Sequence, residues 1–364
     1  MTHIVIATGL YPPEIGGPAT FASLFEKGLA KHSMAHTTIP FSSVRYLPKL
    51  VRHVAYGWRV YRAASSDSIV LALDPVSVGL PSLLAARARG ARFFLRVGGD
   101  YAWEQATQRS CYDDVPESFP GDVHALPLPA RIMYAVQRYV AVRAERVLVQ
   151  STSLGAIVAA WGVAASRISV VPNGMSAVAL PDREALRARY GWHGPVVVSS
   201  GRFVPWKGFE ALIDAVKSLG DIPDLHLVII GGGPLERELR SRADGAVEFI
   251  PPLPKSELLS MISAADVFAL NTRYEGFSHQ ILEAMSVGTP VVTTAIPGNA
   301  DLVVGETALS VPWNDTRALA DSVRRVIEDP ALARSLSLRA RAHAEQFTPE
   351  RTFRESCAAL GISV

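Results

Sequence analysis

The sequence predicts an α/β protein made of two doubly wound domains, each with a parallel sheet. The chain has 364 residues, about twice the length of a common domain. Short β-branched runs alternate with longer helical stretches, as in open parallel sheets. A strand, a glycine-bearing turn and a helix follow one another at residues 4–30 and again at residues 196–219. The sequence therefore predicts two successive domains, each of which begins with its own strand, turn and helix.

In the first half, four apolar runs have the length and composition of buried strands, and helix-length stretches separate them. The expected strands are Ile4–Thr8, Ser68–Leu73, Arg92–Val97 and Arg146–Gln150. The expected helices are Thr20–Ala30, Val51–Ala64 and Leu128–Ala144.

The second half repeats this alternation. Its expected strands are Val196–Ser200, Leu225–Gly231, Val247–Ile250, Val267–Thr272 and Pro290–Thr294. Its expected helices are Gly208–Leu219, Glu236–Ala243, Lys255–Ala264, His279–Val287 and Leu332–Leu360. Gly288 stands where a helix C-cap glycine belongs, and Pro290 prevents the preceding helix from continuing.

The joint between the halves is expected near Val171-Pro172-Asn173-Gly174, because proline and Asn-Gly punctuate a chain. We expect a first domain at 1–172, a second at 173–345, and a C-terminal helix at 346–364 that packs back on the first. Ligands of such folds bind at the carboxyl ends of the strands, so we expect a cleft between the two sheets.

Composition narrows the function classes. Hydrophobic residues make up 49% and charged residues 19% of the chain, which excludes a disordered protein. The two cysteines, Cys111 and Cys357, lack metal or redox spacing and are expected to be structural thiols. We see no leader peptide and no membrane-length apolar run, so we expect a cytoplasmic protein. The net charge of +2 gives little support for nucleic-acid binding.

Three turns carry residues suited to a phosphorylated ligand. The first, Tyr11–Ala19, contains Gly16 and Gly17, which let a backbone approach a ligand just before a helix N-terminus. A plain strand-to-helix turn is the alternative, and the dinucleotide fingerprint is absent. The second turn, residues 201–208, holds Arg202 and Lys207, two cations that could bind a diphosphate or be solvated loop residues.

The third turn joins an expected strand to an expected helix. Glu275 lies in the loop, Gly276, Phe277 and Ser278 lead into the helix, and Glu283 lies on it. Carboxylates can hold pairs of sugar or ribose hydroxyls, and a helix N-terminus favours phosphate.

Together these segments resemble the retaining glycosyltransferases of family four, which have the two-domain GT-B fold. The resemblance runs in order along most of the chain. It rests on the Gly16-Gly17 loop, Val171–Gly174, Gly201-Arg202, Lys207-Gly208, Ile230-Gly231 through Pro234, Ala264-Ala265-Asp266-Val267, the E-x7-E element, Ala284-Met285 and Gly288–Val292.

The resemblance implies roles for the donor-side residues. Arg202 and Lys207 would neutralise the donor diphosphate, in place of a metal ion. Glu275 would hold sugar hydroxyls and Glu283 the ribose. The remaining contacts would come mainly from backbone groups of Gly16, Gly17, Leu253 near the nucleobase, Gly276, Phe277 and Ser278.

On the acceptor side, relatives often place His or Asp after the strand that ends at Val97, and Asp100 is the candidate here. The alternative is a helix-capping or turn aspartate. Ser278-His279-Gln280 stands where many relatives have Gly-Leu-Pro, so the donor sugar is open. Pro297–Asp301 likewise shortens a Gly-Gly-x-x-Glu element of many relatives.

The implied activity is retaining transfer of a hexose from a nucleotide diphosphate sugar, without metal or other cofactor. The acceptor would be a glycan or a lipid-linked molecule in cell-surface polysaccharide or glycolipid synthesis. Residues 44–62 mix cations with aromatic and aliphatic side chains, and could contact an anionic membrane or form an ordinary surface helix. A sugar-nucleotide epimerase of the same fold and a non-catalytic sugar-binding protein remain alternatives.

Overall fold

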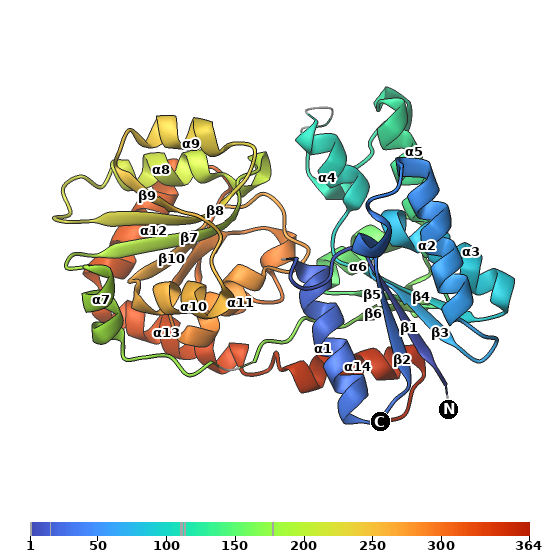
Figure 1. Cartoon of the computed structure of the whole chain (residues 1–364). Coiled ribbons are helices and arrows are strands. Elements are labelled where there is room, and N and C mark those ends of the chain that lie inside the picture. Colours follow the sequence, from blue (N-terminus) through green and yellow to red (C-terminus); the bar gives the residue numbers. More distant parts are fainter. Residues whose placement is uncertain (1, 15, 110–111, 113, 177) are drawn as a thin grey trace. The chain divides into compact units, whose positions relative to one another are not determined.

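The computed structural model describes residues 2–14, 16–109, 112, 114–176 and 178–364. The chain divides into two compact units (Figure 1). Unit 1 comprises Met1–Gly174 together with Thr348–Val364, and unit 2 comprises Met175–Phe347. Each unit contains one six-stranded sheet, and all the pairings between the described strands are parallel. The predicted pair of doubly wound sheets is therefore confirmed.

The sheet of unit 1 has the strand order β2-β1-β3-β4-β5-β6. Its strands are β1 (Ile4–Thr8), β2 (His36–Pro40), β3 (Ile69–Ala72), β4 (Arg92–Val97), β5 (Val147–Val149) and β6 (Ile168–Val170). Its α-helices are α1 (Gly17–Lys31), α2 (Lys49–Ala63), α3 (Leu80–Arg89), α4 (Tyr101–Gln108), α5 (Leu128–Arg143), α6 (Thr152–Ala160) and α14 (Pro349–Leu360). Its short helical turns are η1 (Phe41–Val44), η2 (Pro75–Gly79), η3 (Pro116–Ser118), η4 (Val123–Ala125) and η5 (Ala165–Arg167).

Helices cover both faces of this sheet (Figure 1). On one face, α1 and α14 pack against alternate residues of β1 and β3, such as Ile6 and Leu71. The other face carries α2, α3 and α5. From α14, Phe353 and Cys357 enter the core, and burial raises the pKa of the Cys357 thiol to about 12. Cys357 is therefore an unreactive core residue, as predicted, while Cys111 lies outside the described residues.

The sheet of unit 2 has the strand order β12-β11-β10-β7-β8-β9. Its strands are β7 (Val196–Arg202), β8 (His226–Gly232), β9 (Val247–Ile250), β10 (Val267–Leu270), β11 (Val291–Thr294) and β12 (Leu309–Val311). Its α-helices are α7 (Arg183–Tyr190), α8 (Phe209–Lys217), α9 (Glu236–Ala243), α10 (Lys255–Ala264), α11 (His279–Val287), α12 (Thr316–Glu328) and α13 (Pro330–Ala344). Its short helical turns are η6 (Pro205–Lys207) and η7 (Pro297–Asn299).

Alternate strand residues of unit 2 fill two separate cores. Val198 and Phe268 pack with α10 and α11 on one face, while Val197 and Ala269 pack with α8 and α12 on the other. Because both faces are covered, the inner strands carry runs of consecutive apolar residues, such as Val196–Val198 and Val267–Leu270.

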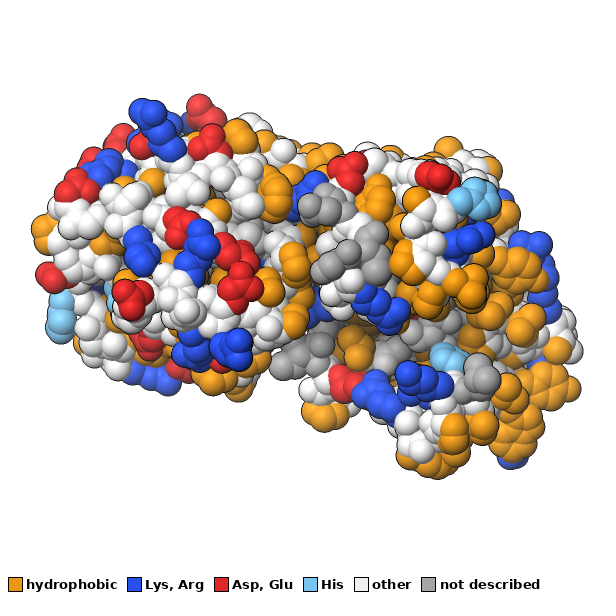
Figure 2. Space-filling view, turned by 90° about the horizontal axis from the view of Figure 1, so that it is seen from above, with side chains coloured by type: hydrophobic (Ala, Val, Ile, Leu, Met, Phe, Trp, Pro, Cys, Tyr) orange, Lys and Arg blue, Asp and Glu red, His pale blue; other side chains and the backbone are white. Residues whose placement is uncertain are grey.

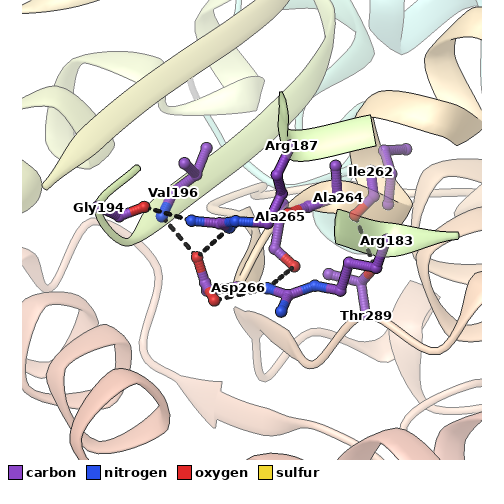
Figure 3. A network of polar contacts seen from close by, with 9 residues as sticks. All are labelled: Arg183, Arg187, Gly194, Val196, Ile262, Ala264, Ala265, Asp266 and Thr289. Atoms are coloured by element: carbon purple, nitrogen blue, oxygen red, sulfur yellow. Dashed lines mark hydrogen bonds and ion pairs between the residues drawn. The ribbon is translucent and has the colours of Figure 1, made fainter. Parts of the chain in front are cut away.

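A polar network at the amino ends of β7 and β10 ties α7 to this sheet (Figure 3). Asp266 Oδ2 accepts hydrogen bonds from the Val196 amide at 2.8 Å and from Arg187 Nη1 at 2.9 Å, and its Oδ1 accepts one from Arg183 Nη2 at 2.6 Å. Arg187 also donates to the carbonyl of Gly194 at 2.6 Å. The Ala264–Val267 segment therefore has a structural role, at the edge opposite the strands' carboxyl ends.

The expected helix Leu332–Leu360 is in fact two helices. Residues 345–348 separate α13 from α14, and Thr348 caps α14 by accepting a hydrogen bond from the Arg351 amide at 3.1 Å. Pro349, the first residue of α14, cannot donate to a preceding helical turn. The break coincides with the passage of the chain from unit 2 into unit 1.

Candidate functional site

The strand order of unit 2 determines where a ligand can bind at the carboxyl edge of its sheet. From β7 the chain proceeds to β8 and β9 on one side, and then returns to β10 on the other side of β7. The loops that follow β7 and β10 therefore diverge, and such a switch point leaves a crevice at the carboxyl edge of an open sheet. Arg202 ends β7, Lys207 lies in the turn after it, and Glu275 follows β10. These three predicted site residues thus flank the switch point.

Lys207 and Glu275 form an ion pair at this edge. Lys207 Nζ lies 2.5 Å from Glu275 Oε1, and the two side chains are only 8% and 11% exposed. Gly208, which follows Lys207, has φ +52°, and an added Cβ would lie 2.4 Å from Asn271 Nδ2. Asn271 donates to the Gly208 carbonyl at 2.9 Å. The lysine turn is therefore held against the segment that carries Glu275.

Arg202 is the exposed cation of this edge. It is the last residue of β7, and its guanidinium lies 5.7 Å from the centroid of the Trp206 ring. Trp206 is itself buried within η6, one residue before Lys207. The turn thus presents one cation at the surface and one beneath it, a suitable arrangement for an anion with two phosphate groups.

The N-terminus of α11 completes this side of the site. Ser278 is fully buried and caps the helix, because its Oγ accepts a hydrogen bond from the Ile281 amide at 3.4 Å. Phe277 is 4% exposed and belongs to the core. The Ser278 hydroxyl therefore serves the helix, while the positive end of the α11 dipole lies at the edge where phosphate would bind.

Gly298 fixes the backbone of the glutamate loop. A Cβ at this position would lie 1.9 Å from the Glu275 carbonyl oxygen. Only glycine allows η7 to approach so closely. The segment 297–301, which the sequence left without a role, therefore supports Glu275, next to Gly276 in the same loop.

Glu283, the second predicted carboxylate, has a partner that the sequence reasoning missed. Lys255 Nζ, from the start of α10, lies 3.0 Å from Glu283 Oε1. Burial raises the pKa of the Glu283 carboxyl, and Lys255 opposes this shift. Leu253, predicted to lie near a nucleobase, is partly buried two residues before Lys255. A lysine just after the Pro251-Pro252-Leu253 loop was the signal that could have identified this pair.

In unit 1, the predicted glycine turn lies at the start of α1. Gly16 is the N-cap residue with φ +155°, and Gly17 is the first helical residue. A Cβ on Gly16 would lie 2.9 Å from Leu10 Cδ1. The Tyr11 hydroxyl donates to Glu26 Oε2 at 2.5 Å, which ties the turn to α1. Ile15 of the same turn lies outside the described residues.

Asp100 is buried and caps α4. Its Oδ1 accepts hydrogen bonds from the Trp103 amide at 3.0 Å and from Gln137 Nε2 at 2.9 Å. The residue is 0% exposed, and burial raises the pKa of its carboxyl to about 6. This geometry is that of the helix-capping alternative. An acceptor-orienting role for Asp100 stays a prediction.

The sequence reasoning missed a second carboxylate in unit 1. Asp74 follows β3, and the switch point of this sheet lies between β1 and β3. Its Oδ1 accepts hydrogen bonds from the Val76 and Ser77 amides at 2.9 and 2.5 Å. A Cβ on Gly9, after β1, would lie 2.7 Å from Asp74 Oδ2.

Electrostatics single out the same carboxylate. Burial raises the pKa of Asp74 to about 6, and burial together with this carboxylate raises the pKa of Tyr101, at the start of α4. The groups that follow β1, β3 and β4 therefore converge around Asp74. An aspartate directly after an apolar strand and before Pro75 was the available signal.

Within the described ranges, no group of three His, Cys, Asp or Glu side chains is placed to hold a metal ion. Likewise, none of the helices in the described part of the chain combines the length and the apolarity needed to cross a bilayer.

Solved structures share this architecture. Sucrose-phosphate synthase from Thermosynechococcus elongatus superimposes with a TM-score of 0.81 at 20% identity, covering 98% of both chains. HepE from Anabaena, solved in complex with UDP-glucose, gives a TM-score of 0.77 at 17% identity, covering 99% of this chain and 100% of that one. With two parallel six-stranded sheets, the fold is that of the GT-B glycosyltransferases.

Sequence comparisons identify the family. The family described as "Glycosyl transferases group 1" matches residues 182–343, and "Glycosyl transferase 4-like domain" matches residues 16–174. The chain belongs to family four of the GT-B glycosyltransferases, as the sequence resemblance predicts.

Two curated relatives illustrate the range of the family. The GDP-mannose-dependent monoacylated alpha-(1-6)-phosphatidylinositol monomannoside mannosyltransferase of Corynebacterium glutamicum is 30% identical over 177 residues, 45% of this chain and 46% of the relative. The D-inositol 3-phosphate glycosyltransferase of Nocardioides sp. is 34% identical over 243 residues, 59% of this chain and 53% of the relative. The chain spans about half the length of the curated relatives it matches.

Proposed function

We propose that this protein is a hexosyltransferase that uses a nucleotide diphosphate sugar as donor. The observation that carries the proposal is the arrangement at the switch point of unit 2. There, Arg202, the buried Lys207–Glu275 ion pair and the N-terminus of α11 lie at one edge of the sheet. Cations and helix dipole suit a diphosphate, and the carboxylate suits the hydroxyls of the attached sugar.

The ion pair suggests how the donor is received. Without a ligand, Glu275 neutralises Lys207, so a buried charge is not left alone. A diphosphate would take over Lys207, and Glu275 would turn to the sugar hydroxyls. As the sugar–phosphate bond breaks, Arg202, Lys207 and the α11 dipole would stabilise the negative charge on the leaving oxygens. These groups would do the work of a metal ion, so the proposed reaction is metal-independent.

The finer assignments rest on the family resemblance. We propose that the sugar keeps its anomeric configuration, with the departing phosphate accepting the proton of the acceptor hydroxyl. Glu283 would hold the ribose, with Lys255 setting its charge. The acceptor would be a glycan or a lipid-linked molecule in cell-surface polysaccharide or glycolipid synthesis, on the cytoplasmic side of a membrane. Residues 44–62 would provide the membrane contact.

A binding experiment without metal tests the donor site. Uridine, guanosine and adenosine diphosphates and their sugar esters would be added in the presence of a chelator, and thermal unfolding recorded. A ligand at 100 times its Kd stabilises by about 2.7 kcal/mol, a shift of roughly 5–10 °C for a unit of this size. We expect one nucleotide series to give this shift.

Matched variants assign the shift to the proposed site. Arg202→Ala should reduce it strongly, while Arg317→Ala, whose side chain is 94% exposed on α12, should leave it unchanged. If no nucleoside diphosphate stabilises the protein at millimolar concentration, the proposal is wrong. Isomerised nucleotide sugar formed without an acceptor would instead identify an epimerase.

A further inference from the structure

Helix α2 has two apolar faces, only one of which is buried. On the inner face, Tyr56 and Val60 are fully buried, and the Tyr56 hydroxyl donates to the Ile39 carbonyl at 2.6 Å. On the outer face, Val51, Val54 and Trp58 are 51%, 75% and 57% exposed. The core of unit 1 therefore accounts for only half of the apolar side chains of this helix.

The outer side chains form a stripe. Positions 51, 54 and 58 are spaced by three and four residues, which places them above one another on an α-helix. Tyr61, one turn further, is 38% exposed. Single exposed apolar residues are common, but a continuous stripe across three turns of helix indicates a binding surface. We call these four residues the outer stripe of α2.

Arginines border the outer stripe on both sides. Arg59 and Arg62 are exposed on one side, and the Arg62 guanidinium lies 4.9 Å from the centroid of the Trp58 ring. On the other side, Arg89 of α3 lies 4.8 Å from the centroid of the Tyr61 ring. The two helices are in direct contact, since a Cβ on Gly57 would lie 3.3 Å from Pro81 Cβ.

Beside Trp58, a shallow groove opens between α2 and the edge strand β2. It encloses about 540 Å³ and is lined by Thr37, Thr38, Arg59 and Arg62 among others. Hydroxyls and guanidinium groups are donors that suit a phosphate group. Ile39, Pro40 and Trp58 also line it, so the groove combines apolar walls with two guanidinium groups next to the outer stripe.

Carboxylates are absent from this stretch of the sequence. Residues 27–66 and residues 75–99 contain no Asp or Glu. The same segments hold cations of this surface, Lys49, Arg59, Arg62, Arg87 and Arg89. Arg45 also lies in them but pairs with Glu14, outside these segments. In Figure 2, basic and apolar side chains lie side by side over unit 1, at the right of the view. The surface thus combines apolar area with positive charge that its own helices do not neutralise.

We propose that the α2–α3 face of unit 1 binds the surface of an anionic lipid bilayer. Val54 and Trp58 would enter the boundary between headgroups and acyl chains, where tryptophan is favoured. The flanking arginines would keep their apolar stems on the stripe and place their guanidinium groups on lipid phosphates. The proposal rests on the proposed function, because it specifies the membrane contact put forward there for residues 44–62. It concerns unit 1 alone, so its failure can be distinguished from a failure of donor binding in unit 2.

The charge pattern argues against a second copy of this chain as the occupant. A two-fold dimer brings the same patch together from both protomers, so arginines would face arginines. Like charges in contact are destabilising, and these helices supply no carboxylates to offset them. A bilayer that contains anionic lipid supplies phosphates along the whole stripe.

Vesicle co-sedimentation of the full chain tests the proposal. The vesicles would contain phosphatidylcholine alone, or phosphatidylcholine mixed with phosphatidylglycerol. We expect binding to the anionic vesicles only, with release by salt. Each cation near such a surface contributes about fivefold to partitioning, so Arg59→Gln/Arg62→Gln should bind roughly 25-fold more weakly. Val54→Ser/Trp58→Ser should lose at least about tenfold.

Matched controls come from unit 2. Leu338→Ser and Arg317→Gln change side chains that are 65% and 94% exposed, and both should bind vesicles like the wild type. All four variants should unfold cooperatively near the melting temperature of the wild type, which shows that they are folded whether or not a nucleotide binds. The proposal is overturned if the wild type binds no anionic vesicles, or if the α2 variants bind as well as the controls. It is also overturned if the wild type is dimeric and Val54→Ser/Trp58→Ser makes it monomeric.

Discussion

Replacing Glu275 with glutamine should strengthen the binding of a nucleoside diphosphate. Glu275 Oε1 lies 2.5 Å from Lys207 Nζ. A phosphate oxygen on the other side of this ammonium would lie about 5.5 Å from the carboxylate, from two N–O contacts in series. At an effective dielectric constant of about 20, two negative charges at that distance repel by about 3 kcal/mol. Halving this for partial solvation leaves roughly 1.5 kcal/mol, about tenfold in affinity.

The substitution should favour diphosphate binding for a second reason, which concerns the stability of the free protein. In Glu275→Gln, the buried Lys207 loses its counter-ion in the free protein, so the free protein is destabilised. A bound diphosphate would restore a counter-ion. We therefore expect a lower melting temperature without ligand and a larger upward shift with ligand than in the wild type.

Titration calorimetry with the diphosphate identified in the binding panel measures the affinity directly. The affinity of Glu275→Gln should rise about tenfold, while transfer of the sugar should slow because the hydroxyl contact is weakened. Glu328→Gln, which removes an exposed partner of Arg324, serves as the control and should change neither quantity. Equal or weaker diphosphate binding by Glu275→Gln would show that Lys207 does not exchange the carboxylate for phosphate.

Three further changes test other parts of the structure. Relative to Asp100→Asn, the wild type should lose roughly 2 kcal/mol of unfolding free energy as the pH rises from 4 to 7, because the folded carboxyl, with a pKa of about 6, holds its proton more tightly than the unfolded one. Parallel pH dependences of the two proteins in chemical denaturation would contradict this. Asp266→Asn should lower the free energy of unfolding by about 1–3 kcal/mol. The control Asp321→Asn, at a side chain that is 67% exposed, should lower it little, and equal losses in the two variants would refute the structural role of the network. Gly298→Ala should lower the free energy of unfolding by about 1–3 kcal/mol and weaken donor binding, because the new methyl group displaces the Glu275 backbone. A crystal structure of the variant in which the Glu275 loop has not moved would refute this reasoning.

The central strands could be predicted from the sequence because they are buried on both faces. Ile4–Thr8 and Arg92–Val97, two inner strands of the first sheet, were predicted with the bounds that the structure shows. The edge strand β9 was also predicted, but the edge strands β2, β6 and β12 were missed. Strand β2 contains two threonines and a proline, and β6 and β12 have only three residues each. Such strands lack the continuous apolar run that signals burial between two helical layers.

The sequence predicted which residues belong to the site and in which loops they lie, but not which of their side chains are in contact. Strand order follows from tertiary packing, so the convergence of Lys207 and Glu275 on one switch point could only be expected by resemblance. For short polar side chains, the sequence could not distinguish helix capping from ligand binding. Ser278 and Asp100 both cap helices, and a capping residue reads in sequence like a ligand-binding one. Asp74 went unnoticed because no motif surrounds it.

The path of the chain between the units has a consequence for biosynthesis. Unit 2 is one continuous segment, and its two ends are joined by a hydrogen bond of 2.8 Å from the Met175 amide to the Phe347 carbonyl. Unit 1 is discontinuous, and its core lacks Phe353 and Leu360 until α14 is made. During synthesis the ribosome therefore releases a complete inserted domain before the domain that began first. Until α14 is made, α1 covers its face of the first sheet only in part, so this core stays incomplete.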